Sequence, residues 1–317
     1  MWKEKLEQLI NFAKKGVGLL LFVVCGIAIY REVGSNQNIT AHSVEIQYRL
    51  KEIPFAYWIV LLLMMMTNFL VESIKWKKAL LGQVELNIAQ ALKSVFVGQA
   101  FAFYTPNRIG EYVGRSMMLN TENKVMTMAR MAWSSYAQLL VTIIVGSFAI
   151  FIHPPLYNWL KWASPLLALF SLLVYFRKKS YSSWIRNFNF LQIDNSVKKE
   201  LLSLSFLRYF IFLMQYTWAV HMLHIPIDFF TLWVAISVMF LCISILPTVS
   251  LTELVIRGQL IVLLLTPYCN NSLLLISLST IIWLVNFLLP AIIGAFLLEY
   301  RRQRQMCIRD RTKTIKF

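Results

Sequence analysis

Two stretches of the chain share one order of residue types around a proline. The first reads Tyr104-Thr105-Pro106-Asn107-Arg108-Ile109-Gly110-Glu111-Tyr112-Val113-Gly114-Arg115, and the second reads Ile245-Leu246-Pro247-Thr248-Val249-Ser250-Leu251-Thr252-Glu253-Leu254-Val255-Ile256-Arg257. In each, proline ends an apolar helix because it lacks a backbone donor and clashes with the preceding turn. A short polar bridge follows, and a Glu-x-x-x-Arg pair opens the next helix. The pattern predicts two proline-broken helical hairpins that carry charge.

The charged pairs in these stretches indicate a binding site. Glu and Arg four residues apart share a helix face and can pair. An ionised residue at bilayer depth costs about 2.5–3.5 kcal/mol and usually marks a pathway or pocket. Helices broken at matching positions in two oppositely oriented halves point to a transporter's substrate site, and helix N-termini attract anions. The alternative is an interfacial salt bridge beside a plain loop proline. We expect Arg108, Glu111, Arg115, Glu253 and Arg257 to bind substrate, with Pro106, Gly110 and Pro247 as structural hinges.

The composition is typical of a membrane protein. Of 317 residues, 58% are hydrophobic and 15% charged, whereas soluble domains have about half and a quarter. This balance excludes a disordered chain, a disulfide-stapled secreted domain and most soluble enzymes. The four cysteines form no CxxC pair, so neither a disulfide framework nor a zinc knuckle is expected.

Apolar runs along the chain approach the length of about 20 residues that a spanning helix needs. They cover residues 16–30, 54–71, 91–104, 126–152, 156–176, 204–223, 229–246, 254–265 and 273–298. We predict an all-α polytopic integral membrane protein with six spanning helices and two proline-broken re-entrant hairpins in an inverted repeat. The half-polar stretch that ends at residue 203 is expected to form an amphipathic surface helix.

Lysine and arginine set the expected orientation. They cluster at the N-terminus, at residues 75–78 and 177–199 and in the C-terminal tail, whereas the connections 153–155, 225–228 and 267–272 contain none. Both termini are therefore expected in the cytoplasm. The hairpin regions 88–123 and 229–267 would then enter from the cytoplasmic and the outer face, respectively. The net charge of +16 is explained by topology and by contact with anionic lipid, and no nucleic-acid partner is expected.

Residues 105–111 together with Arg115 resemble the proline–arginine–glycine–glutamate signature of the lysylphosphatidylglycerol synthase transmembrane family. These are the flippase-like membrane domains of bacterial multiple-peptide-resistance proteins. The resemblance covers roughly residues 5–300 in span count and order. It departs at 248–252, where the family usually has a glycine-rich turn, and at Asn107, where it commonly has glycine. Asparagine also tolerates left-handed backbone.

The resemblance implies that the chain moves an anionic or modified lipid between the leaflets of the bacterial inner membrane. The synthase domain of the fused proteins lies C-terminal to the membrane region, and this chain ends after its last span, so no enzyme activity is expected. We interpret residues 1–305 as one flippase-like domain and residues 306–317 as a tail that resembles translated adapter sequence. No P-loop or other cofactor motif occurs, and neither a cofactor nor a metal is expected.

Several other polar residues have structural interpretations. We interpret His221 and His224 as a satisfied helix-end pair, and Glu72 and Lys75 as an interfacial pair, with the lining of a lipid entrance as the alternative for the second pair. Polar groups within the spans are expected to form interhelical hydrogen bonds. These are Gln138, Gln215 and Asn286.

Two other functions stay open at the level of sequence. The first is a non-transporting accessory protein that anchors or regulates a lipid-modifying synthase or a glycosyltransferase through basic residues such as Lys75, Lys77 and Lys78. The second is an integral-membrane enzyme acting on a polyprenyl-phosphate head group with Glu111 as general base. The expected partner is a membrane phospholipid or a lipid-linked substrate. Association with a lipid-modifying synthase, a glycosyltransferase or further copies of the chain (a homo-oligomer) is left open.

Overall fold

The described part of the computed structural model is helical throughout. It comprises residues 23–27, 30–31, 39–119, 124–152, 158–177, 193–246 and 248–314, and these residues contain no strand. The all-α prediction is thus confirmed for them. The helices are α2 (Ile39–Glu52), α3 (Phe55–Ala79), α4 (Ile88–Tyr104), η1 (Pro106–Arg108), α5 (Gly110–Met117), α6 (Lys124–Ile152), α7 (Asn158–Phe176), α9 (Asn195–Met222), α10 (Phe229–Ile245), α11 (Ser250–Leu265), α12 (Ser272–Trp283), η3 (Leu284–Leu288) and α13 (Leu289–Thr314).

Four described helical segments are long and apolar enough to cross a membrane. They are Phe55–Ala79, Lys124–Ile152, Trp159–Phe176 and Ser272–Gln303. The helix α10 is apolar but shorter, and α9 contains four charged residues in its first half. The predicted span at 16–30 lies mostly outside the described residues. The chain therefore has the apolar helices of a membrane protein, and the count of six spans stays a prediction.

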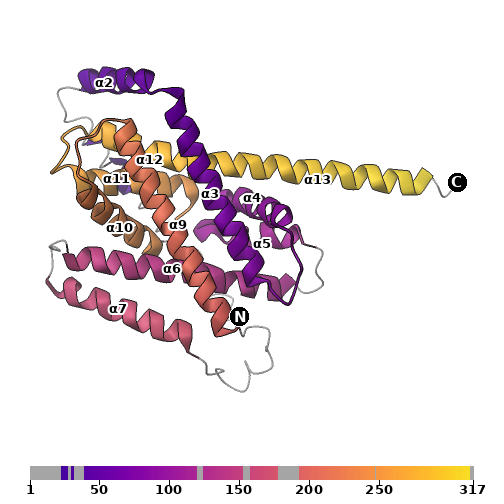
Figure 1. Ribbon diagram of the computed structural model, residues 1–317. Helices are drawn as coiled ribbons and strands as arrows, with labels where there is room; N and C mark the ends of the chain where they lie inside the picture. Colours follow the sequence, from indigo (N-terminus) through magenta and orange to yellow (C-terminus); the bar gives the residue numbers. More distant parts are fainter. Residues whose placement is uncertain are drawn as a thin grey trace, which may run out of the picture.

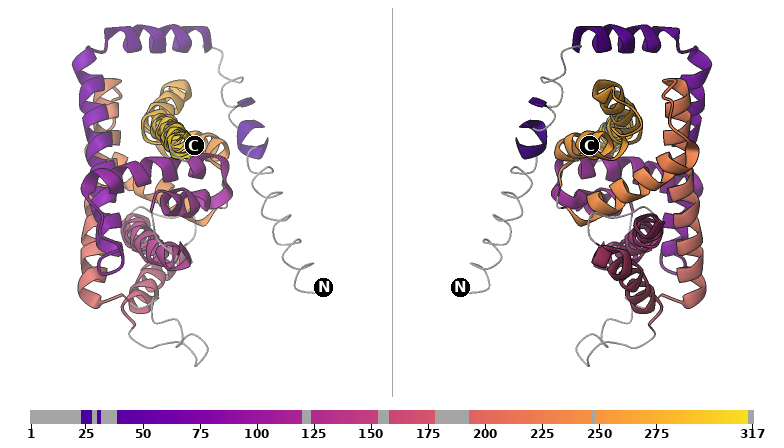
Figure 2. Two further views of the ribbon diagram at one scale, coloured as in Figure 1. Left: turned by 90° about the vertical axis from the view of Figure 1, so that its right-hand side faces the viewer. Right: turned by 90° about the vertical axis from the view of Figure 1, so that its left-hand side faces the viewer.

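The helices run in two main directions. Figures 1 and 2 show α3 and α9 side by side, crossing α6 and α7, with α2 lying across one end of α3. The helix α13 continues away from the other helices toward the C-terminus (Figure 1). Within each proline-broken region the two helices pack on each other, α4 on α5 and α10 on α11.

Two apolar clusters hold this arrangement together. One consists mainly of buried residues from the four helices α9, α10, α11 and α12. The other consists mainly of buried residues from α3, α4 and α6. Side-chain caps fix where several helices begin. Asn87 and Gln90 form a reciprocal capping box at α4, and Asp228 accepts the Thr231 N–H at α10. The two hairpins are thereby anchored at their outer ends, away from their breaks.

Two boundaries differ from the sequence prediction. The helix α3 does not end near residue 71 but continues to Ala79, so Glu72 and Lys75 lie within it. Residues 195–203 do not form a separate surface helix, because they are the first turns of α9. In both places a buried lysine has a partner inside the protein, because Lys75 pairs with Glu72 and Lys198 donates to the Tyr175 carbonyl at 2.9 Å. The backbone of residues 306–314 continues α13.

Gly294 marks a close contact between α13 and α4. A Cβ atom built on Gly294 would lie 1.9 Å from the Phe96 carbonyl oxygen, which is backbone and must move with its helix. We expect Gly294→Ala to destabilise the protein by about 1–3 kcal/mol, as overpacking does. Thermal unfolding of detergent-purified protein measures this. Gly26→Ala is the control, because nothing lies within 4 Å of its added Cβ. Equal unfolding temperatures for both variants would contradict the close approach.

Candidate functional site

Hydrogen bonds of the Thr105 side chain fix the break between α4 and α5 in the first hairpin. Its Oγ1 donates to the Phe101 carbonyl at 3.0 Å and accepts the Gly110 N–H at 2.8 Å. Pro106 opens the short helix η1 between α4 and α5. A Cβ on Gly110 would lie 2.4 Å from the Phe101 carbonyl oxygen, so only glycine fits there. Pro106 and Gly110 thus lie at the break, as the sequence predicts.

The tip of this hairpin has left-handed backbone. Asn107 has φ 51° and Arg108 has φ 58°. The expectation that Asn107 takes the left-handed conformation is confirmed. Arg108 has no such intrinsic tolerance, and non-glycine residues of this kind cluster at functional sites.

The tips of the two hairpins touch each other. The Asn107 N–H donates to the Thr248 carbonyl at 2.9 Å, and the Thr248 N–H donates to Asn107 Oδ1 at 3.1 Å. Pro247, the predicted hinge of the second hairpin, lies outside the described residues. Two segments 141 residues apart are therefore joined at their breaks.

Substitutions at Asn107 separate backbone conformation from the amide contact. Asn107→Gly keeps the left-handed backbone and loses the acceptor for Thr248, whereas Asn107→Ala loses the acceptor and adds a Cβ penalty of about 1–2 kcal/mol. We expect the alanine variant to unfold at a lower temperature than the glycine variant. Thermal unfolding in detergent compares them. An alanine variant as stable as the glycine variant would contradict a left-handed tip.

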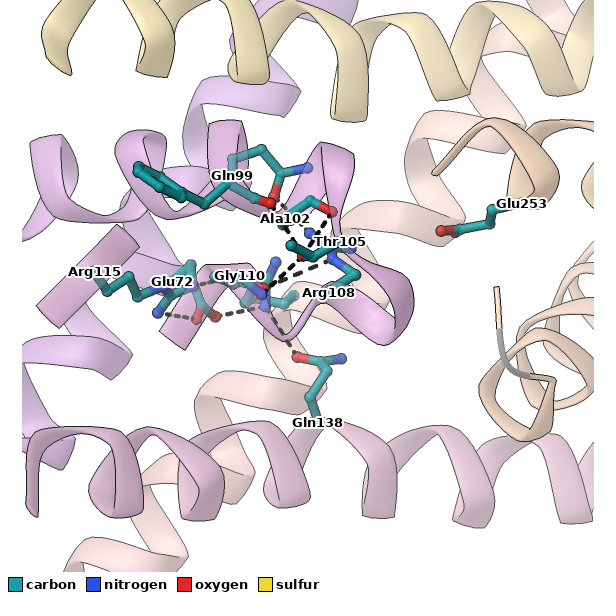
Figure 3. A network of polar contacts seen from close by, with 12 residues as sticks. Glu72, Gln99, Ala102, Thr105, Arg108, Gly110, Arg115, Gln138 and Glu253 are labelled. Atoms are coloured by element: carbon teal, nitrogen blue, oxygen red, sulfur yellow. Dashed lines mark hydrogen bonds and ion pairs between the residues drawn. The ribbon is translucent and has the colours of Figure 1, made fainter. Parts of the chain in front are cut away.

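A cavity of about 700 Å³ lies where both hairpins meet α3, α6 and α9. Its lining includes all five residues predicted to bind substrate: Arg108, Glu111, Arg115, Glu253 and Arg257. Arg115 is 1% exposed and Arg257 is 6% exposed, so neither faces open water. Figure 3 shows Glu253 across the cavity from Arg108. The two halves of the chain thus contribute buried charge to one space.

Glu72 is the centre of the charge network on the side of the first hairpin. Its carboxylate contacts Arg115 Nη1 at 2.7 Å, Arg208 Nη1 at 2.5 Å and Lys75 Nζ at 3.4 Å. Asn68 accepts from Arg208 Nε at 2.8 Å. Residues 68, 72 and 75 recur on one face of α3 and form a polar stripe, of which Glu72 and Lys75 line the cavity.

Gln138 joins three helices at this network. It reaches from α6 toward the network (Figure 3) and accepts from Lys75 at 3.4 Å and from Arg208 at 3.3 Å. Its predicted interhelical hydrogen bonds are therefore confirmed. The predicted interhelical bond of Asn286 is wrong, because its amide donates to Ile282 O of its own helix, and the buried amide of Gln215 has no hydrogen-bond partner among the described residues.

Glu111 continues the network toward the hairpin tip. It pairs with Arg115 four residues on, as predicted, and approaches Arg108 Nε at 3.7 Å. Arg108 also donates to Gln99 Oε1 at 2.5 Å. The Arg108 side chain is 38% exposed, whereas the Arg115 side chain is 2% exposed. Arg108 is therefore the open end of this network.

The second hairpin supplies a separate charge pair. Arg257 donates to Glu253 Oε1 from Nε at 2.9 Å and from Nη2 at 2.5 Å. This confirms the predicted pairing of residues four apart. Its Nη1 lies 3.4 Å from the Tyr216 hydroxyl. Two Arg257 nitrogens on one carboxylate oxygen make a charge-assisted contact that holds the guanidinium in place.

Phe287 lies between the two charge systems. The Arg108 guanidinium carbon is 4.9 Å and the Arg257 guanidinium carbon 5.0 Å from the centre of its ring. Phe287 belongs to η3, a turn of π-helix between α12 and α13. Such turns are rare and frequent at functional sites. Two arginines from opposite hairpins therefore share one aromatic partner.

One interpretation based on sequence needs correction. Glu72 and Lys75 do pair, but they are buried at 6% and 1% exposure and line the cavity, so they are not interfacial. At the start of α5 the Gly110 N–H donates to the Thr105 hydroxyl oxygen, so this one N–H is not available to an anion.

Arg208 is the site residue that the sequence analysis missed. It lies in α9, lines the cavity and joins Glu72. The sequence does mark this residue, because Arg208 is the one charged residue within the apolar run 204–223. Charged residues in such runs usually mark a pathway or pocket.

Comparison with known proteins adds no assignment. No family model matches the chain, and no curated protein matches it. Among the described residues, no three metal-ligating side chains lie close enough to hold a metal ion. The site is thus defined by its own geometry, which is a charged cavity between two broken helical hairpins.

Proposed function

We propose that this chain is a lipid flippase that moves a lipid with an anionic or modified head group between the leaflets of a bacterial inner membrane. The observation that carries the proposal is the meeting of the two hairpins. Arg108 and Arg257 belong to different hairpins and lie within 5.0 Å of the centre of one phenyl ring in a shared cavity. The resemblance of residues 105–115 to the lysylphosphatidylglycerol synthase transmembrane family is consistent with this function.

The proposed topology has six spanning helices, with both termini in the cytoplasm. Residues 88–123 enter from the cytoplasmic face and residues 229–267 from the outer face, as an inverted repeat. The contact between Asn107 and Thr248 supports this arrangement, because hairpins entering from opposite faces meet at their tips. In secondary transporters, substrate sites lie near the bilayer midplane between such broken helices.

In the proposed mechanism the head group moves through the cavity while its acyl tails stay in lipid. Apolar side chains around the two breaks are exposed, with Tyr104 at 84%, Ile245 at 70% and Leu251 at 57%. These surfaces suit acyl chains. The lipid phosphate replaces Glu111 as the partner of Arg108, or Glu253 as the partner of Arg257. When the phosphate leaves, the arginine pairs with its glutamate again. With no nucleotide-binding motif in the sequence, a lipid or ion gradient drives the movement.

Reconstituted vesicles test this proposal. We expect wild-type protein to exchange labelled phospholipid between leaflets and Arg108→Ala to lower that rate at least about tenfold, because one charge-assisted contact of about 1.5–3 kcal/mol is lost. Arg108 is partly exposed, so the variant should fold, which size-exclusion chromatography checks.

The double variant Lys77→Ala/Lys78→Ala is the control. These residues lie outside the cavity, so exchange should stay within about twofold of wild type. If the chain instead anchored an enzyme through its basic surface, the Lys77→Ala/Lys78→Ala variant would lose more function than the Arg108→Ala variant. Wild-type vesicles that exchange neither any phospholipid nor any lipid-linked sugar would overturn the proposal.

A further inference from the structure

The charged side chains that line the cavity do not balance. Three are carboxylates and five are cations, so two positive charges lack a counter-charge among the described lining residues. The carboxylates are Glu72, Glu111 and Glu253, and the cations are Lys75, Arg108, Arg115, Arg208 and Arg257. Isolated charges in a low-dielectric site cost several kcal/mol each unless they are paired. The cavity therefore favours an occupant with about two negative charges.

The excess charge lies on the side of the first hairpin. Glu253 and Arg257 form a neutral pair, whereas four cations share Glu72 and Glu111. Within that group, the Nε atoms of Arg108 and Arg115 are buried without a hydrogen-bond partner. Arg108 Nε has only the 3.7 Å ion-pair contact with Glu111, so both Nε atoms retain an unused hydrogen-bond donor, which is the second sign that the site is built for an anion.

Two arginines are placed to hold the anion jointly. The guanidinium carbons of Arg108 and Arg257 each lie within 5.0 Å of the centre of the Phe287 ring, so they lie within about twice that distance of each other. Guanidinium groups bind phosphate oxygens through paired N–H donors. A terminal phosphate or a diphosphate has enough oxygens for both arginines, whereas a phosphodiester has two free oxygens for the same task.

We propose that the head group is a dianion, a phosphate monoester or diphosphate at the end of a lipid, in preference to the singly charged phosphodiester of ordinary glycerophospholipids. This rests on the proposed function, because it concerns the same cavity. A phosphate monoester carries about −1.5 to −2 charge at pH 7 and its second pKa is about 6. Binding of a monoester lipid should therefore weaken as the pH falls from 8 to 5.

Titration of the protein's own groups also changes binding with pH, and a phosphodiester lipid serves as the control for this effect. The titratable groups facing the anion are the three glutamates, Lys75, the arginines, Tyr112 and Tyr209, and no histidine is among the described lining residues. Any titration of these groups affects a phosphodiester lipid as well. The ratio of the two affinities then isolates the charge of the ligand.

The experiment measures lipid binding to the purified full chain in detergent by thermal-shift titration. The probes are dioctanoyl phosphatidate, farnesyl diphosphate and dioctanoyl phosphatidylglycerol. At pH 8 we expect the first two to bind about tenfold more tightly than the third, since one further charge-assisted contact is worth about 1.5–3 kcal/mol. At pH 5 the preference for phosphatidate should shrink to about twofold.

Variants and soluble anions complete the test. Arg108→Gln should reduce the preference for phosphatidate to about twofold, and Arg49→Gln, outside the cavity, should keep it. Glycerol 3-phosphate and pyrophosphate should bind far more weakly than the lipids, and equal affinity would overturn the assignment to a lipid. Equal affinity for phosphatidylglycerol and phosphatidate would overturn the dianion but leave lipid exchange intact. Absence of both binding and exchange for every lipid would overturn the proposed function as well.

Discussion

Glu72→Gln is expected to prevent stable folding. The Glu72 carboxylate contacts Lys75, Arg115 and Arg208 in a buried setting, and its loss raises the uncompensated positive charge of the cavity by one. Removing one partner of a buried ion pair costs about 3–5 kcal/mol, which is a large part of the stability of a typical protein. Yield of monodisperse protein and its thermal unfolding temperature measure the effect.

Two further variants make this result specific. Glu200→Gln removes a carboxylate that pairs with Lys78 at 2.8 Å on the surface, and such pairs contribute about 0–1 kcal/mol. Adding Arg208→Gln to Glu72→Gln removes one cation as well and returns the charge excess to its original value, so part of the stability should return. A Glu72→Gln protein as stable as Glu200→Gln would show that the network does not hold the fold.

The double variant Glu253→Gln/Arg257→Gln is expected to fold normally and to lose lipid exchange. The two residues neutralise each other, and replacing both members of a buried pair is often neutral for stability. Arg257 is the second hairpin's only cation among the described residues that line the cavity. We therefore expect exchange in reconstituted vesicles to fall at least about tenfold.

The control for this variant is a pair of the same spacing elsewhere. Glu45 and Arg49 are also four residues apart and lie 2.7 Å from each other, but they do not line the cavity. Glu45→Gln/Arg49→Gln should keep exchange within about twofold of wild type. If instead the Glu253/Arg257 variant exchanged lipid at the wild-type rate, the second hairpin would have no part in transport.

Local features of the site could be predicted from the sequence because they depend on spacing. The pairs Glu111–Arg115 and Glu253–Arg257 follow from helical periodicity, since residues four apart share a face. The break at Pro106 follows from the missing proline N–H. Apolar run lengths identified α4, α6, α7, α10 and α11 within a few residues, but they placed the end of α3 and the start of α9 wrongly and did not show how the helices cross one another.

Long-range features could not be predicted, because no local pattern encodes them. The contact between Glu72 and Arg208 joins residues 136 apart through the packing of α3 on α9. Phe287 is one of 22 phenylalanines, and nothing in its neighbourhood distinguishes it as the partner of two arginines. The extension of α3 beyond residue 71 was missed because its polar residues resemble a membrane boundary until their buried partners are known.

The π-turn at Leu284–Leu288 has a consequence for chain length. Its hydrogen bonds span five residues where an α-helix spans four, so this stretch accommodates one amino acid more than a regular helix of the same rise. Deleting a single residue here would let the helix regularise and would rotate the segment that carries Phe287 relative to α13. Related chains that are one residue shorter at this point should therefore lack an aromatic ring shared by the arginines, whatever residue they have at the aligned position.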